Sequence, residues 1–191
     1  MPKEDWIKNT VQNIFEREGM YPTKEIKTVL DIGCGLSFKS QYIKADIRVG
    51  VDIYRPYLEK IEADIPYVAI NADALQVGDL FLPQSFDLVL ILDIVEHLEK
   101  EDALKLMDMA ETIAKVAVIV ETPRGFIPQN IDIWGWGGHT YQTHRSGWEP
   151  EDFTERGYQI VLRDYRMSDV QRHTDQAVNP DIQMIDAIKH I

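Results

Sequence analysis

Aspartates and glycines recur in this sequence where runs of apolar residues end. The run TVLDIGCG ends with Asp31, Gly33 and Gly35, and a later run, VGVDI, ends near Asp52. Glycines in such a turn free backbone N–H groups, and the start of a following helix favours negative charge. A carboxylate about 20 residues further along is suited to accept hydrogen bonds from ribose hydroxyls. The spacing therefore indicates a site for a ligand that carries a ribose.

Two further runs end in groups that can bind ligands or transfer protons. NADAL presents Asp73, and LDIVEHL presents Asp93, Glu96 and His97. Because parallel strands end at one edge of a sheet, we expect these side chains to share that edge with the glycine turn. His97 is a candidate general base, because unperturbed imidazole titrates near neutrality.

A third segment, WGWGGHTYQTHRSGW at 134–148, has the period of neither a helix nor a strand. Its glycines allow bending, and its tryptophans supply apolar area that could close a site against water. His139 and His144 are further candidate bases, and Tyr141 could orient a substrate. The two histidines could also bind a metal, but no cysteine is near and their spacing is not diagnostic. We therefore expect no metal.

The elements that must position these residues alternate between strand and helix. Apolar runs predict strands at 28–32, 47–53, 67–71, 86–93 and 116–121, and helical spacing predicts helices at about 4–18, 37–45, 55–64 and 99–115. Later segments predict a helix at 149–157 and two strands that pair with each other, at 158–167 and 181–191. This order is typical of an α/β fold with a mostly parallel, Rossmann-like sheet and helices on both faces.

Composition narrows the class of protein. A chain of 191 residues, 45% hydrophobic and 27% charged, predicts one globular domain over 1–191. No apolar run approaches the roughly 18 residues of a membrane span, and the charged start MPKEDWIKNT lacks a signal-peptide core, so we expect a cytoplasmic protein. The lone cysteine, Cys34, forms no internal disulfide. A net charge of −12 without a basic patch makes a nucleic-acid partner unlikely.

The glycine turn discriminates between nucleotide ligands. A nicotinamide dinucleotide prefers G-x-G-x-x-G, whereas here Phe38 stands where the third glycine would allow a close helix approach. A ligand with adenine and ribose but no pyrophosphate needs fewer glycines and tolerates acidic groups around a cationic centre. S-adenosylmethionine is such a ligand.

At this point the chain resembles the class I S-adenosylmethionine-dependent methyltransferases, especially small ones related to the ubiquinone and menaquinone biosynthesis methyltransferases. The likeness rests on VLDIGCG, VGVDI, NADAL and SFDLVLILDIVEHL, in the order of the family, over about residues 28–122. It implies a seven-stranded sheet in which six strands are parallel and the last is antiparallel. One departure is Ser37, where the family often has glycine.

The resemblance also implies roles for individual residues. The methionine part of the cofactor would lie at Asp31, Gly33 and Gly35, and the ribose at Asp52. The adenine ring and the sulfonium end would be bordered by residues that follow three strands: Ile53, Asp73, Ala74, Leu75, Leu92 and Asp93.

The sequence therefore predicts methyl transfer from S-adenosylmethionine to a small-molecule acceptor, with S-adenosylhomocysteine as product, by a monomer or homodimer. We expect a cap at residues 1–22 and a lid at 125–150 on the acceptor side. Two alternatives remain: a non-catalytic cofactor-binding or regulatory module, and a nicotinamide-dependent oxidoreductase, which Phe38 disfavours.

Overall fold

The computed structural model describes residues 22–166 and 181–191, apart from residues 23, 38, 63–65 and 133. Its centre is a seven-stranded sheet of order β3-β2-β1-β4-β5-β7-β6. The strands in chain order are β1 (Thr28–Ile32), β2 (Ile47–Asp52), β3 (Tyr67–Asn71), β4 (Phe86–Leu92), β5 (Ala114–Pro123), β6 (Gln159–Arg166) and β7 (Asp181–His190).

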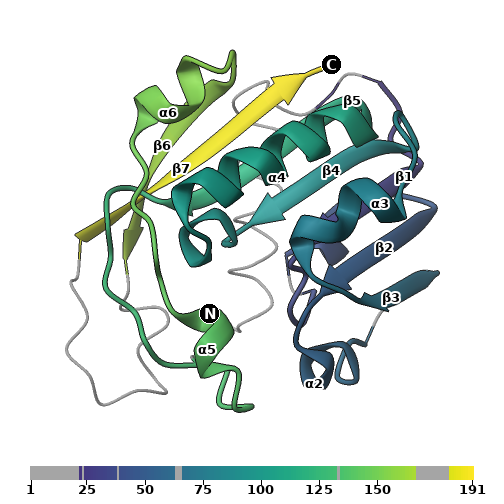
Figure 1. Cartoon of the computed structure of the whole chain (residues 1–191). Coiled ribbons are helices and arrows are strands. Elements are labelled where there is room, and N and C mark those ends of the chain that lie inside the picture. Colours follow the sequence, from purple (N-terminus) through teal and green to yellow (C-terminus); the bar gives the residue numbers. More distant parts are fainter. Residues whose placement is uncertain (1–21, 23, 38, 63–65, 133, 167–180) are drawn as a thin grey trace.

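Strand direction matches the expected topology. Strands β1 to β5 pair in parallel, whereas β7 is antiparallel to both of its neighbours, β5 and β6. Figure 1 shows β7 running against β4. The mostly parallel sheet with an antiparallel last strand is thus confirmed. Strand order reverses between β1 and β4, and ligands of such sheets bind beyond the strand ends at this point.

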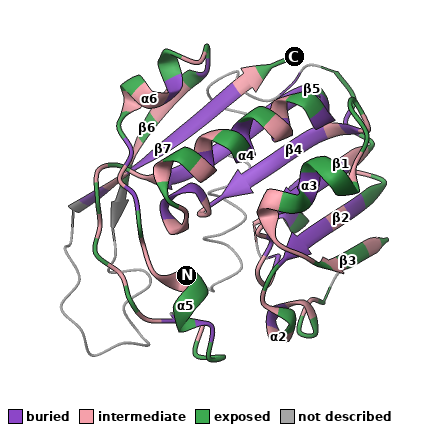
Figure 2. Cartoon of the chain, in the orientation of Figure 1, coloured by how far each residue is buried: buried purple, intermediate pink, exposed green. Residues whose placement is uncertain are grey.

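Apolar side chains of the strands divide between two clusters. Leu30, Val89 and Val118 belong to one cluster, and their neighbours Val29 and Leu88 belong to the other. Alternation of this kind follows from the two-residue period of a strand and places one cluster on each face of the sheet. The sequence runs are continuously apolar because both faces are buried, as Figure 2 shows for β4.

The longest described helix, α4 (Lys100–Ile113), covers the first of these faces. Its buried residues Ala103, Leu106, Met107 and Ala110 follow a helical spacing and join the cluster that contains Leu30. The same cluster includes residues of α3 (Val77–Leu80) and α6 (Pro150–Thr154).

Several helices are shorter than the sequence predicts. Of the helix expected at 37–45, the described residues form only a 3-10 turn, η1 (Ser40–Tyr42), and of that expected at 55–64 only α2 (Arg55–Leu58). Tyr57 is the one buried side chain of α2, so little packing supports a longer helix. The helix predicted at 4–18, within the expected cap at 1–22, lies outside the described residues, as does Phe38.

Three short helical elements remain in the described part of the chain, and each lies in the connection after a strand. Two are 3-10 turns, η2 (Ala74–Gln76) and η3 (Val95–His97), and the last is α5 (His139–Gln142). Among the residues that the structure describes, no helix has both the length and the apolar character needed to cross a bilayer.

Candidate active site

The glycine turn after β1 folds back onto β2. The amides of Gly33 and Cys34 both donate to the carbonyl oxygen of Val51, at 2.7 and 3.1 Å. Gly33 has a φ of 68°, and a Cβ there would lie 2.0 Å from the Ile94 side chain. Gly35 has a φ of 51° and open space where its Cβ would stand. The first glycine is therefore required for packing, whereas the second leaves the turn uncovered.

Ser37 continues this left-handed backbone. Its φ is 57°, a conformation that glycine adopts more readily than serine, and its Oγ lies 2.7 Å from Ser40 Oγ. Ser37 thus adopts a backbone conformation that suits glycine, the residue that the resemblance leads us to expect here. Cys34 in the same turn is buried, and burial raises the pKa of its thiol, so the thiol stays protonated.

Asp52 ends β2 and is hydrogen-bonded to the glycine turn. Its Oδ2 accepts from the Gly35 amide at 2.8 Å, and its Oδ1 accepts from the Tyr54 amide at 2.7 Å. Burial raises the pKa of the carboxyl group, although the two amides oppose the shift. Ile53, the next residue, is exposed. The strand end thus places an acceptor group beside an uncovered apolar side chain.

Asp31 lies beneath the same turn and is almost wholly buried. Burial raises its pKa to about 7, with a further rise from the Asp52 carboxylate. Ser40, Arg48 and Lys39 lower the pKa by smaller amounts. Asp31 is therefore partly protonated at neutral pH.

Asp73, after β3, acts as a helix cap. Its Oδ1 accepts from the Leu75 amide at 2.9 Å, and its own amide donates to Gln76 Oε1 at 3.3 Å. These bonds form a capping box at the start of η2, where Ala74 and Leu75 are partly buried. The Asp73 carboxylate is thereby held at the edge of the sheet where β2 and β3 end, which also carries Asp52.

Charged groups converge where β4 and β5 end. Leu92 is buried, and Asp93 has a φ of 55° and forms an ion pair with Lys39, which also contacts Glu121 at the end of β5. Burial alone would lower the pKa of Lys39, but the two carboxylates raise it above its ordinary value. Lys39 therefore remains charged between two acids.

Glu96, His97 and His144 form a compact group beyond β4, although His144 is 47 residues from His97 in the chain. The imidazole centroids of the two histidines lie 4.7 Å apart. Burial raises the pKa of Glu96 to about 8, with Asp93 adding to the rise. Burial also lowers the pKa of His97 to about 4 and lowers that of His144. Both imidazoles are therefore neutral at physiological pH.

His139 and Tyr141, the other two candidates, lie apart from that group. His139 is exposed, and its Nδ1 accepts from the Asp132 amide at 3.0 Å. Tyr141 is also exposed, and its ring centroid lies 5.7 Å from that of Tyr54, near the end of β2. The sequence predicted four catalytic candidates, and the structure groups two of them.

The tryptophan-rich segment is organised by Asp132, which sequence reasoning missed. Its two carboxylate oxygens accept hydrogen bonds of 2.7–2.9 Å from four donors. These donors are the amides of Trp134, Trp136 and Gly138 and the hydroxyl of Tyr57. Because Tyr57 belongs to α2, the carboxylate ties this segment to the part of the chain that follows Asp52.

Lys39 and Glu121 were also missed. Glu121 ends the predicted strand VAVIVE, so its position at the sheet edge was readable from the sequence. Lys39 had no comparable signal, because its partners, Asp93 after β4 and Glu121 in β5, lie 54 and 82 residues away in the chain.

Comparison with known proteins agrees with this architecture. A family model described as a methyltransferase domain matches residues 30–117. No curated protein matches the sequence.

Solved structures resemble the chain along nearly all of its length. A methyltransferase from Archaeoglobus fulgidus, described as SAM-dependent, is 20% identical with a TM-score of 0.58, covering 95% of this chain and 94% of that one. Another from Leishmania major is 12% identical with a TM-score of 0.66, covering 97% and 74%. The magnesium protoporphyrin IX methyltransferase of Synechocystis PCC 6803, solved with bound SAM, is 16% identical with a TM-score of 0.57, covering 97% and 79%. At these identities the structures establish the fold.

Proposed function

We propose that this chain, which carries a class I S-adenosylmethionine-dependent methyltransferase domain, transfers the methyl group of S-adenosylmethionine to a small-molecule acceptor. The observation that carries the proposal is the hydrogen bond from the Gly35 amide to Asp52, which joins the glycine turn and the acid of β2 into one site. The family match over residues 30–117 supports the same reaction.

The residues present fit this cofactor. The open space at Gly35 leaves room for the methionine part, next to Asp31 and Gly33. Each Asp52 oxygen accepts one backbone amide and retains a second lone pair for a ribose hydroxyl. The exposed Ile53 offers an apolar surface that an adenine ring would cover.

Further contacts are proposed at the ends of β3 and β4. Asp73 has the acceptor character that an adenine amino group requires, with Ala74 and Leu75 beside it. Leu92 and Asp93 would border the sulfonium end, which carries a positive charge. Bound S-adenosylmethionine would supply an electrophilic methyl group. Lys39 would compete with that charge for Asp93, so its ion pair must rearrange or be shared.

The acceptor side is proposed to lie at Glu96, His97 and His144. Methyl transfer depends mainly on positioning, and an oxygen acceptor must also lose a proton. The neutral imidazoles could serve as proton acceptors or as ligands of a cation. His139 is a poor base because its Nδ1 already accepts a hydrogen bond, so its Nε2 carries the proton of the neutral ring.

The lid assignment of residues 125–150 is also part of the proposal. Asp132 holds this segment against Tyr57, and Tyr54 donates to the carbonyl oxygen of Trp136 at 2.7 Å. Both tyrosines follow Asp52, so the segment borders the proposed ribose site. A small acceptor suits such an enclosure better than a macromolecule does.

Titration calorimetry with S-adenosylhomocysteine tests the cofactor site. We expect Asp52→Ala to weaken binding by about 10-fold or more, because a charged hydrogen-bonded contact is removed. Asp79→Ala is the matched control, since Asp79 is an exposed acid on α3. Absence of binding by the folded wild type would overturn the proposed function, and equal binding by Asp52→Ala would overturn the role of this residue.

A further inference from the structure

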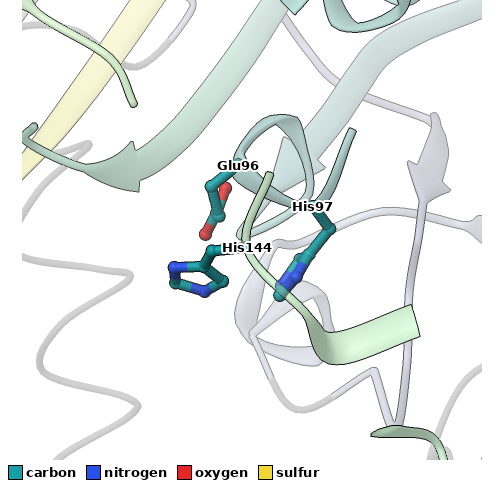
Figure 3. A group of neighbouring side chains, drawn as sticks. All are labelled: Glu96, His97 and His144. Carbon is teal, nitrogen blue, oxygen red and sulfur yellow. The ribbon is translucent and has the colours of Figure 1, made fainter. Parts of the chain in front are cut away.

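Three side chains able to bind a metal ion meet beyond the end of β4. Glu96 and His97 belong to η3, and His144 follows α5. One potential ligand atom from each lies within 4.8 Å of the others, and Figure 3 shows the three side chains next to one another. Two imidazoles and one carboxylate form a donor set that zinc and related divalent transition metals prefer.

The hydrogen bonds of the two imidazoles leave their Nε2 atoms as acceptors. His144 Nδ1 lies 2.6 Å from the carbonyl oxygen of Ile127, and His97 Nδ1 lies 3.3 Å from that of Thr143. A carbonyl oxygen can only accept, so each Nδ1 carries a hydrogen, which leaves Nε2 as the nitrogen that can bind an ion. Metal-binding histidines usually show this pattern, in which the second nitrogen donates to an outer partner.

Glu96 is oriented in the same way. The buried hydroxyl of Thr122 donates to Glu96 Oε2 at 2.8 Å. The amides of Arg145 and Ser146 donate to the Glu96 carbonyl oxygen at 2.7 and 3.2 Å, which binds the His144 segment to η3. The three side chains are thus supported by hydrogen bonds from β5 and by backbone contacts before any ligand arrives.

We propose that Glu96, His97 and His144 bind one divalent transition-metal ion of the zinc type. Ligands about 2 Å from one ion lie closer together than 4.8 Å, so the side chains would move inward by roughly 1 Å on binding. Asp93 adds negative charge near all three groups, whereas Lys39 lies near Glu96 and Arg145 near His97 with positive charge. The ion would add positive charge beside Asp93.

A three-ligand site leaves an open position on the ion, where the oxygen of an acceptor could bind. An oxygen bound there would be polarised, and its hydroxyl proton would be lost more readily to water. The proposal therefore extends to an acceptor with a hydroxyl group, whose proton such an ion would help to remove. This part rests on the proposed methyl transfer, whereas metal binding itself does not.

Calorimetric titration of the chelator-treated, full-length protein with Zn²⁺ tests the site. The wild type should bind one ion, and His144→Ala should bind at least about 100-fold more weakly, because loss of an outer partner alone costs 10- to 100-fold. Thr122→Val, which removes only the hydroxyl that orients Glu96, should weaken binding by about 10-fold. His190→Ala is the control, since His190 is exposed at the end of β7.

Co²⁺ gives a second readout through its visible absorption, which reports the coordination geometry of the bound ion. We expect bands in the wild type and in His190→Ala that are lost in His144→Ala, with unchanged circular dichroism. Equal Zn²⁺ affinity in wild type and His144→Ala, or no binding by the folded wild type, would overturn the metal site. S-adenosylhomocysteine binding is measured separately, so failure of the metal site and failure of the cofactor site are distinguishable.

Discussion

Asp31 couples stability to pH at the scale of a single residue. Burial raises its pKa from 3.8 to about 7, so between these values the folded protein holds a proton that the unfolded chain has released. The stability that this bound proton contributes is fully present below the unfolded pKa of 3.8. It is lost as the pH rises through the folded pKa of about 7. At alkaline pH the buried Asp31 carboxylate is charged and therefore destabilises the folded protein.

We expect Asp31→Asn to gain stability relative to the wild type when pH rises from 5 to 8. The relative gain should be at least about 1.4 kcal/mol, the equivalent of one pKa unit. Urea unfolding of both proteins at the two pH values measures it. Parallel pH profiles would show that Asp31 ionises in the folded protein as readily as in the unfolded chain.

The residues around the glycine turn could be predicted because topology determines where they meet. Adjacent parallel strands end at one edge, so motifs that follow β1 and β2 must be neighbours, and Gly35 does bond to Asp52. The grouping of His97 with His144 could not be predicted. It depends on backbone hydrogen bonds between η3 and the distant segment that carries Arg145 and Ser146.

At the scale of an element, the segment from Asp132 to Gly138 owes its conformation to one carboxylate. No hydrophobic period predicts this arrangement, because the four donors are three backbone amides and one hydroxyl from α2. The sequence indicated a flexible aromatic segment, whereas its tryptophans have different environments. Trp148 is fully buried and Trp136 is 47% exposed. Trp148 thus packs in the core, whereas Trp136 keeps apolar area at the surface, where it could help to close a site.

Asp132→Asn should loosen this segment. The amide side chain keeps one oxygen acceptor, and its NH2 group faces at least one backbone amide that has lost its acceptor, which should cost about 1–3 kcal/mol. Hydrogen exchange should rise at one or more of the amides of Trp134, Trp136 and Gly138, while the strands stay protected. Tyr57→Phe is the milder comparison, because it removes one donor.

The pH dependence of this element has the opposite sign to that of Asp31. Burial alone would raise the pKa of Asp132, but its four hydrogen bonds lower it below 3.8. The stability that it contributes is present above the unfolded pKa and is lost as pH falls through the folded value. Asp132→Asn should therefore lack this acid sensitivity. Equal exchange in wild type and variant would contradict the role of the carboxylate.

At the scale of the whole molecule, a charge network connects the parallel strands with the antiparallel end of the sheet. Lys39, after β1, contacts Glu121 at the end of β5. Arg163 on β6 bonds to both oxygens of Asp186 on β7, at 2.9 and 3.1 Å, and lies 3.4 Å from Glu121. Glu121 and Asp186 are partners in the β5–β7 register. Sequence periodicity predicted every strand involved but not this network, because its members are distant in the chain.

Arg163→Met tests how strongly the network holds the sheet together. The substitution keeps much of the side-chain volume but leaves Glu121 and Asp186 buried side by side with one cation fewer, which should cost about 3–5 kcal/mol. Arg55→Met is the matched control, because Arg55 pairs with Glu59 on the surface, where a salt bridge contributes about 1 kcal/mol or less. Urea unfolding at neutral pH compares the two variants.

The double variant Arg163→Met/Asp186→Leu separates loss of charge pairing from loss of packing. Removing the second buried charge should recover a large part of the stability, since an apolar pair can replace a buried ion pair at little cost. The loss in Arg163→Met should also shrink at lower pH, where protonation neutralises the carboxylates that lost their partner. If the double variant is no more stable than Arg163→Met, packing of the Arg163 side chain rather than its charge joins β6 to the sheet.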